Sequence, residues 1–350
     1  MSRTVLARSL FELWSQADNY NEFYNRLKHC PQTKLEQFCS QDHSFRIQVE
    51  AFGKKISTGK KVEKIEKLAF LDFQGSIDLK NPVNSFQLFE YYGEDTNNIP
   101  DEPYNIYFGL WIADSQKKVV SDLSLKGRKF IANTSMDTML SLVMSNLAKV
   151  SCGDLILDPF VGSGSLLVSA AYHGGHVLGT DINYLLLHGL SKPTRVGAKK
   201  RENESILSNL KQYNLESKYI DVIVADASKS LWHQSNTLKF DAIITDPPYG
   251  IRESSEKVGS EKVNFKIPEH YISGHIPSKI KYNLCDIVKD LLDFAALHLK
   301  IGGRLVFWMP VEKNSFSKQI ISHQYFNVIS LSEQHLSGHH SRVLIVLERK

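Results

Sequence analysis

The stretch Asp154-Leu-Ile-Leu-Asp158-Pro-Phe-Val-Gly162-Ser-Gly164 decides the fold of this chain. A short apolar run ends in an acid, and a turn with two glycines leads directly into a helical pattern at 165–173. Glycine suits such a turn because it takes positive φ readily and lets a ligand approach the backbone. Strand, glycine turn and helix in this order indicate the first unit of a parallel α/β sheet.

The rest of the chain repeats this alternation of strands and helices. Apolar strands are expected at 155–157, 176–179, 220–224, 242–245 and 304–308. Helices are expected at 165–173, 203–213 and 284–299, and the runs 326–331 and 343–347 suggest a terminal hairpin. The pattern predicts a Rossmann-like α/β domain over residues 126–350, with a mostly parallel seven-stranded sheet that ends in this hairpin.

Residues 1–125 have a different rhythm and are expected to form a small α+β domain. Helices are expected at 21–28 and 60–70, and strands at 44–52, 76–79 and 105–112. The segment 44–52 alternates apolar and polar residues, which is typical of a half-buried strand. Six lysines lie between Lys54 and Lys67, and Lys199-Lys200-Arg201 forms a second basic cluster. Taken alone, each cluster is equally consistent with a solvated helix face or loop.

The composition is that of an ordinary globular protein, with 42% hydrophobic and 23% charged residues. No apolar run is long enough to cross a bilayer, and the first residues lack a signal-peptide pattern, so a cytoplasmic location is predicted. Four cysteines without a C-x-x-C pair predict reduced thiols and no metal site. A net charge of +4 is weak evidence for a nucleic-acid partner, because many enzymes with small substrates are as basic.

Acidic residues follow three successive strands, at the sheet edge where ligands bind in such folds. Asp158 closes the first strand, Asp181 follows the second and Asp226 follows the third. Each aspartate alone is explained equally well as a helix N-cap, and a lone G-x-G as a tight turn. Capping does not readily explain three acids at successive strand ends together with the glycine pair.

S-adenosylmethionine explains this set better than NAD or ATP. A nucleotide phosphate favours basic residues or a G-K-[ST] loop, which this stretch lacks. Asp181 lies 23 residues past Asp158, close to the offset at which an acid reaches ribose hydroxyls, and Asp226 is placed to accept from the adenine amine. The expected cofactor-binding residues are Asp158, Phe160, Gly162, Gly164, Asp181, Ile182, Asp226, Ala227 and Asp246.

A rigid tetrapeptide, Asp246-Pro247-Pro248-Tyr249, follows the fourth strand. Its two prolines stop the strand and each fix φ at about −65°, which gives the stiffness that a positioning site needs. The Asp246 carboxylate and the Pro247 carbonyl can accept both hydrogens of an aryl amine and turn its lone pair toward a methyl group. Tyr249 offers a face to a base lifted out of its stack. These four residues are the expected catalytic residues, and the alternative is a plain Pro-Pro turn.

Together these motifs resemble the amino-methyltransferases of nucleic acids. More narrowly, the stretches Gly127-Arg-Lys-Phe-Ile-Ala-Asn-Thr134-Ser135-Met-Asp137 and Asp246-Pro-Pro-Tyr-Gly-Ile-Arg-Glu253 are similar to the THUMP-domain tRNA guanosine-N2-methyltransferases that act on guanosine 10. The resemblance runs from near the N-terminus to about residue 310. It implies a class I methyltransferase domain and adds Thr134 and Ser135, at the methionine end of the cofactor, to the expected site. Either residue is also a candidate helix cap.

The same resemblance implies an N-terminal RNA-binding domain that grips the acceptor end of tRNA. The segment Lys54 to Lys67 and the motif Ile77-Asp-Leu-Lys-Asn-Pro82 would belong to it. The resemblance also implies a small zinc-binding activator subunit, as in the eukaryotic members. The family's N-terminal domain normally has further residues before the point where this chain begins, so a truncated form or a divergent start is expected.

Two alternatives to the tRNA guanine-N2-methyltransferase were weighed. An adenine-N6 methyltransferase shares the Asp-Pro-Pro-Tyr chemistry, and the THUMP-like N-terminal half argues against it. A non-catalytic tRNA-binding protein with a methyltransferase fold is disfavoured because the acids and the tetrapeptide are intact. Beside the tetrapeptide, the polar stretch 252–282 is expected to form a substrate lid that orders when RNA binds.

Overall fold

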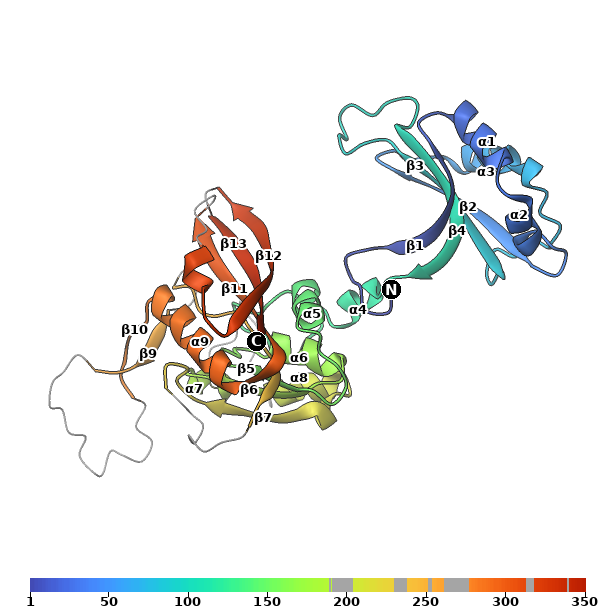
Figure 1. The fold of residues 1–350 in the computed structure, drawn as a ribbon. Helices are drawn as coiled ribbons and strands as arrows, with labels where there is room; N and C mark the ends of the chain where they lie inside the picture. Colours follow the sequence, from blue (N-terminus) through green and yellow to red (C-terminus); the bar gives the residue numbers. More distant parts are fainter. Residues whose placement is uncertain are drawn as a thin grey trace. The chain divides into compact units, whose positions relative to one another are not determined.

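The computed structural model of this chain describes residues 1–188, 190, 204–229, 238–250, 254–260, 277–312, 318–338 and 340–350. The chain forms two compact units, Met1–Lys117 and Lys118–Lys350 (Figure 1). The short helix α4 (Lys117–Asp122) spans the boundary, and most of it belongs to the second unit.

The first unit is a four-stranded sheet with its helices on one face (Figure 1). The strands lie in the order β1-β4-β3-β2; β2 and β3 are parallel and the other neighbours antiparallel. Phe23 and Leu27 of the first helix are fully buried in one core with Phe86 and Phe108 of the sheet. The elements are β1 (Ser9–Ala17), α1 (Tyr20–Lys28), α2 (Gln32–Phe38), β2 (Phe45–Phe52), α3 (Thr58–Glu66), β3 (Asn84–Tyr91) and β4 (Asn105–Asp114).

The strands expected at 44–52 and 105–112 are confirmed as β2 and β4, and the helix expected at 21–28 is confirmed as α1. The strand expected at 76–79 is wrong. Only an isolated bridge joins Ile77 to Phe45, and the Asp78 carboxylate accepts hydrogen bonds from the main-chain N–H groups of Lys80 and Asn81. These bonds turn the chain at the point where a strand would have to continue.

The second unit contains a seven-stranded sheet in the order β12-β13-β11-β8-β5-β6-β7. β13 runs opposite to the other six strands of this sheet, so the predicted mostly parallel sheet with a C-terminal hairpin is confirmed. The strands are β5 (Leu155–Asp158), β6 (His176–Asp181), β7 (Tyr219–Val224), β8 (Phe240–Thr245), β11 (Leu299–Glu312), β12 (Phe326–Ser337) and β13 (His340–Arg349).

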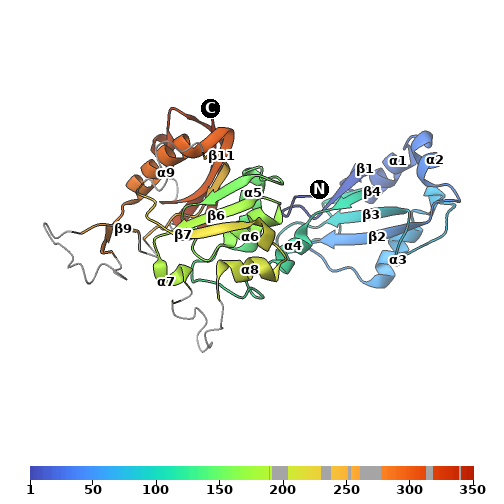
Figure 2. The ribbon, with the colours of Figure 1, turned by 90° about the horizontal axis from the view of Figure 1, so that it is seen from below.

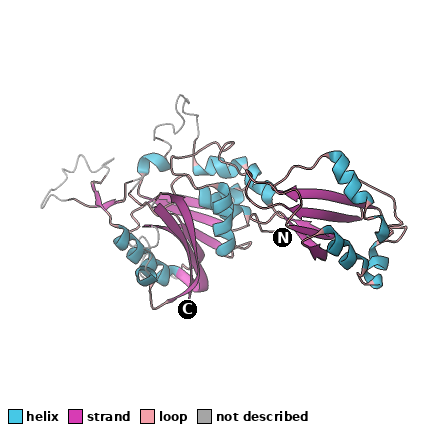
Figure 3. Cartoon of the chain, turned by 90° about the horizontal axis from the view of Figure 1, so that it is seen from above, coloured by secondary structure: helices cyan, strands magenta, loops and turns pink. Residues whose placement is uncertain are grey.

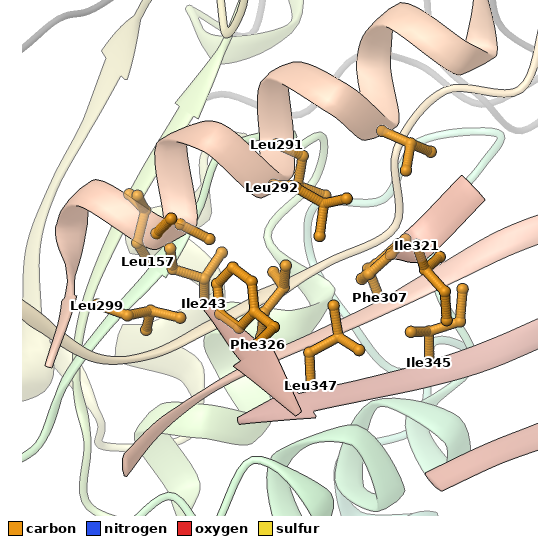
Figure 4. Close-up of a cluster of buried hydrophobic side chains, with 14 of the residues drawn as sticks. Leu157, Ile243, Leu291, Leu292, Leu299, Phe307, Ile321, Phe326, Ile345 and Leu347 are labelled. Carbon is orange, nitrogen blue, oxygen red and sulfur yellow. The ribbon is translucent and has the colours of Figure 1, made fainter. Parts of the chain in front are cut away.

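Helices cover both faces of this sheet (Figures 2 and 3). On one face, Leu291 and Leu292 of α9 belong to a core that contains Ile243 and Phe307 (Figure 4). On the other face, the turn between α6 and β6 packs against β5, because a Cβ on Gly175 would lie 2.9 Å from the Ile156 side chain. The helices are α5 (Thr138–Leu147), α6 (Ser165–Tyr172), α7 (Tyr184–Leu187), α8 (Ile206–Gln212) and α9 (Leu284–His298).

Two features singled out in the sequence lie wholly or partly outside the described residues. The basic cluster at 199–201 is one of them. The other is the expected lid, of which 252–253 and 261–276 are not described. Its described ends pair as the antiparallel strands β9 (Glu256–Val258) and β10 (Lys279–Lys281). Within the described part of the chain, no helix is both long and apolar enough to span a membrane.

Candidate active site

The four aspartates singled out in the sequence lie at the carboxyl ends of neighbouring strands. Asp158 ends β5, Asp181 ends β6, Asp226 follows β7 and Asp246 follows β8. Because β5 pairs in parallel with both β6 and β8, these strand ends meet at one edge of the sheet. The architecture therefore brings the predicted cofactor residues and the predicted catalytic residues to the same edge.

The glycine turn between β5 and α6 has the backbone that its residues predict. Gly162 and Gly164 have φ values of 50° and 77°, in the left-handed region that favours glycine. A Cβ on Gly164 would lie 2.7 Å from the Ile206 side chain, so this glycine also permits close packing of α8. A Cβ on Gly162 would meet no atom of the described residues within 4 Å, so these residues leave open space at this glycine.

Asp181 is held against this turn by main-chain donors. Its Oδ2 accepts from the Gly162 N–H at 2.9 Å and its Oδ1 from the Asn183 N–H at 2.8 Å. Burial raises the pKa of this carboxyl, and the two N–H donors oppose the rise. Ile182 is half-buried beside it, at the end of β6. The carboxylate is thus fixed at the rim of the glycine turn, where the ribose hydroxyls were expected.

Asp158 is buried beneath the turn, with only 2% of its surface exposed. Its Oδ1 accepts from the Thr245 hydroxyl at 2.7 Å and from the Phe160 N–H at 3.1 Å. Burial raises the pKa of this carboxyl to about 7, and the charges of Asp181 and Asp246 add to the rise. Asp158 therefore ties the glycine turn to the strand that ends at Asp246.

The segment before α5 contacts the glycine turn directly. The Ser135 and Ser163 hydroxyls are 2.6 Å apart, and Ser135 Oγ accepts from the Ala132 N–H at 2.8 Å. Helix α5 is capped by Asp137, whose carboxylate accepts from the N–H groups of Met139 and Leu140. The reading of Thr134 or Ser135 as the helix cap is therefore wrong, and Ser135 instead joins its segment to the turn.

The tetrapeptide after β8 forms a tight hydrogen-bonded corner. The Tyr249 hydroxyl donates to Asp246 Oδ1, and the Ser255 hydroxyl donates to the Pro248 carbonyl at 2.8 Å. Burial and then the Asp246 charge raise the pKa of the Tyr249 phenol well above its usual value. The nearby positive charge of Arg342 acts in the opposite direction and lowers this pKa. Pro247 is buried in this corner.

Asp226 lies under the hairpin of β9 and β10. Its Oδ1 accepts from the Ser228 N–H at 2.9 Å, and its Oδ2 accepts from the Val258 N–H of β9 at 2.8 Å. The next residue, Ala227, lines a narrow apolar cavity together with Phe160. The other lining residues are Leu157, Pro159, Thr180, Lys229, Tyr282, Ile287, Leu291 and Phe294.

Comparison with known proteins covers both units. Residues 1–117 match a family model described as the Tmrp11 THUMP N-terminal domain, and residues 126–263 match one described as an RMKL-like methyltransferase domain. A relative from Homo sapiens, tRNA (guanine(10)-N(2))-methyltransferase TRMT11, is 45% identical over all of this chain and 76% of its own length.

The chain belongs to the tRNA (guanine(10)-N(2))-methyltransferases. A TRMT11 from Gallus gallus is 44% identical over all of this chain and 76% of its own length. The Saccharomyces cerevisiae enzyme is 30% identical over all of this chain and 81% of its own length. Among solved structures, TrmN from Thermus thermophilus is 20% identical, covers 99% of this chain and 84% of its own, and has a TM-score of 0.43. The fold and family that the motifs implied are confirmed.

Three residues of this candidate site were not expected from the sequence. Thr245 bonds to Asp158, Ser163 contacts Ser135, and Arg342 contacts Tyr249. Thr245 directly precedes the tetrapeptide and Ser163 lies within the glycine turn, so their positions in the sequence could have predicted that they belong to the site. Arg342 is distant in sequence from every motif and reaches the site only because β13 returns beside β11.

Proposed function

We propose that this chain transfers the methyl group of S-adenosylmethionine to N2 of guanosine 10 in tRNA. The observation that carries the proposal is the hydrogen bond between Asp158 and Thr245. It joins the glycine turn expected to hold the cofactor to the strand that presents the tetrapeptide expected to hold the base. Family membership supports the choice of the guanine amine and of tRNA.

The residues around the glycine turn fit the proposed cofactor. The open space at Gly162 leaves room for a ligand against the backbone, and Asp181 is fixed beside it as a hydrogen-bond acceptor for ribose hydroxyls. When bound, the cofactor would supply an electrophilic methyl group. We assign Phe160, Ile182 and Ala227 to its adenine side and Thr134 and Ser135 to its methionine side. Gly164 and Asp158 support the turn from beneath, through contacts with Ile206 and Thr245.

The target base has a place to enter beside the tetrapeptide. A depression of about 520 Å³ opens at Tyr249 and Gly250 and continues along the hairpin of β9 and β10. Two lysines of that hairpin, Lys279 and Lys281, line it, and their charges favour the phosphates on either side of a base that has been flipped out.

Asp246 and Tyr249 rearrange when the amine binds. In this structure the Tyr249 hydroxyl donates to Asp246 Oδ1, the oxygen that we expect to accept a hydrogen of the guanine amine. Tyr249 therefore turns away from Asp246 as the base arrives, and its ring becomes available for stacking. Asp246 and the Pro247 carbonyl would then orient the amine. As N2 gained the methyl group, the bond between that carbon and the cofactor's sulfur would break, and the amine hydrogen held by Asp246 would pass to its carboxylate as a proton.

The family of this chain also indicates its partners. The match of residues 1–117 to a THUMP domain supports tRNA as the substrate. The family resemblance supports a small zinc-binding activator subunit as a partner. We infer that the activator is needed for full activity, and a comparison of the chain alone with the co-expressed complex tests this directly.

The function is tested with unmodified tRNA and labelled S-adenosylmethionine, with and without a candidate activator. We expect methylation at guanosine 10, mapped as N2-methylguanosine by nucleoside analysis. Asp246→Ala should abolish transfer while calorimetry still detects cofactor binding. Methyl-adenosine as the product would support the adenine-N6 alternative instead. An active Asp246→Ala enzyme would refute the role given to Asp246.

A further inference from the structure

The C-terminal hairpin contributes an arginine to the corner where the base is expected. Phe307 of β11 pairs with Thr245 of β8, so β11 runs on past the end of β8 beside the tetrapeptide. Arg342 of β13 pairs with Pro310 on this extension. The register of the sheet therefore brings Arg342 next to Tyr249, although 93 residues separate them in the sequence.

Neighbouring side chains fix the Arg342 guanidinium in place. Its centre lies 4.2 Å from the centroid of the Trp308 ring, and its Nε donates to Gln334 Oε1 at 2.8 Å. Trp308 is 97% buried, and its ring N–H has no hydrogen-bond partner among the described residues. Stacking and the Gln334 bond hold the guanidinium plane while the terminal nitrogens keep their donors. The guanidinium therefore presents oriented donors near the Asp246 carboxylate.

The donors of Arg342 and the acceptor of Asp246 match the groups along one edge of guanine. Arg342 lies close enough to the Tyr249 hydroxyl to lower its pKa, and the same hydroxyl donates to Asp246. A guanine whose N2 replaced that hydroxyl at Asp246 would carry its O6 acceptor on the same edge of the ring. Arginine is the side chain that most often recognises O6 and N7 of guanine.

We propose that Arg342 recognises the guanine carbonyl O6 and so selects guanine for methylation. The proposal rests on the function proposed above and goes beyond it by naming a specificity residue outside the motifs. Adenine bound through its N6 amine presents no carbonyl to Arg342. When Tyr249 turns toward the base, the Arg342 donors leave the Tyr249 hydroxyl and bind O6.

The test compares tRNA carrying guanosine at position 10 with tRNA carrying 2-aminopurine, which keeps the N2 amine and lacks O6. The enzyme is prepared with its activator, as wild type, Arg342→Gln and Arg304→Gln. Arg304 is a matched control because it belongs to the same sheet but pairs with Glu348 at the other end of β11. Values of kcat/KM are measured for both substrates, and cofactor affinity is measured for each variant.

We expect wild type to prefer guanosine over 2-aminopurine by about 10-fold to 100-fold, the discrimination typical of such a contact. Arg342→Gln should lose most of that preference, with kcat/KM falling for guanosine and changing less than about threefold for 2-aminopurine. Arg304→Gln should keep the wild-type ratio. Equal slowing of both substrates by Arg342→Gln would show a structural role and overturn this inference alone. A wild-type enzyme that leaves guanosine N2 unmethylated would overturn the proposed function as well.

Discussion

Asp158 links the pH dependence of folding to the candidate active site. It is buried with hydrogen bonds from Thr245 and Phe160, yet its pKa in the folded chain is raised from 3.8 to about 7 because burial outweighs those bonds. At low pH the carboxyl is protonated in both the folded and the unfolded chain. As the pH rises from 3.8 to about 7, the unfolded chain ionises first, so the folded chain loses stability.

Asp158→Asn should remove this pH dependence. Asparagine keeps an acceptor oxygen for Thr245 and Phe160 and carries no charge to desolvate. The variant should match wild type near pH 4 and exceed it above pH 7, by at most about 4 kcal/mol for a rise of this size. Urea unfolding between pH 4 and 8 measures the difference. If the difference between the two proteins stayed constant across that range, ionisation of Asp158 would not be its source.

The lysines in and around α3 fall into two groups: those paired within the first unit and those free to contact a nucleic acid. Lys64 is paired with the buried Glu90, and Lys67 with Glu63 on the same helix. Before the helix, Lys54 Nζ donates to the carbonyls of Pro100 and Asp101. The remaining lysines of the 54–67 cluster have exposed or half-buried side chains: Lys55, Lys60 and Lys61. Half of the cluster therefore serves the fold.

The variant Lys60→Ala/Lys61→Ala should weaken tRNA binding. Loss of two phosphate contacts should lower the slope of log K against log salt by about 2 and reduce affinity roughly 10-fold near 0.1 M salt. Filter binding across a salt series measures both. Lys149→Ala/Lys289→Ala, which removes two exposed lysines of the second unit, is the control and should leave the slope unchanged. Equal effects of the two double variants would argue against α3 as the RNA-binding element.

The hairpin of β9 and β10 depends on Asp226 through the Val258 N–H. Asp226→Ala should release it, because the replacement leaves that donor without an acceptor. Hydrogen exchange at 256–258 and 279–281 should then speed up by at least about 10-fold, and cofactor affinity should fall by a similar factor. Unchanged exchange in these strands would mean that strand pairing alone holds the hairpin.

The sequence predicted features that are local in the chain and missed those created by contact at long range. The glycine turn, the strand-end acids and the proline corner follow from residue types at short spacing, so their places were correct. β3 was missed because Asn84 and Ser85 are buried at its start and break the polar–apolar alternation. β1 was missed because two register shifts against β4 interrupt its period. Arg342 depends on the register of three strands, which no local pattern encodes.

For the whole molecule, each unit has a core of its own. Phe86 and Phe108 lie in the core of the first unit, and Ile243 and Phe307 in that of the second. The first unit also buries an acid–base pair, since Glu90 is fully inaccessible to solvent and accepts from Lys64 at 2.6 Å and from the Tyr92 hydroxyl at 3.1 Å. Burial raises the pKa of Glu90 to about 7, so the carboxyl is fully ionised only above neutral pH. Tyr20 donates to the same carboxylate. Stability in the first unit should therefore change independently of cofactor binding in the second.

Lys64→Met tests this independence. At pH 8, above the Glu90 pKa of about 7, the substitution leaves the Glu90 carboxylate buried without its cation, which should destabilise the first unit by at most about 3–5 kcal/mol. Scanning calorimetry should show one transition moving to lower temperature and the other staying in place, and cofactor affinity should remain that of wild type. Adding Glu90→Gln removes the buried charge and should restore most of the lost stability.

Methyl transfer to tRNA should fall only at temperatures where the first unit has melted, because the site around Asp246 keeps its own core. If both transitions moved together, or if cofactor binding fell with the first transition, the two units would fold as one cooperative body and the buried pair would support the active site as well.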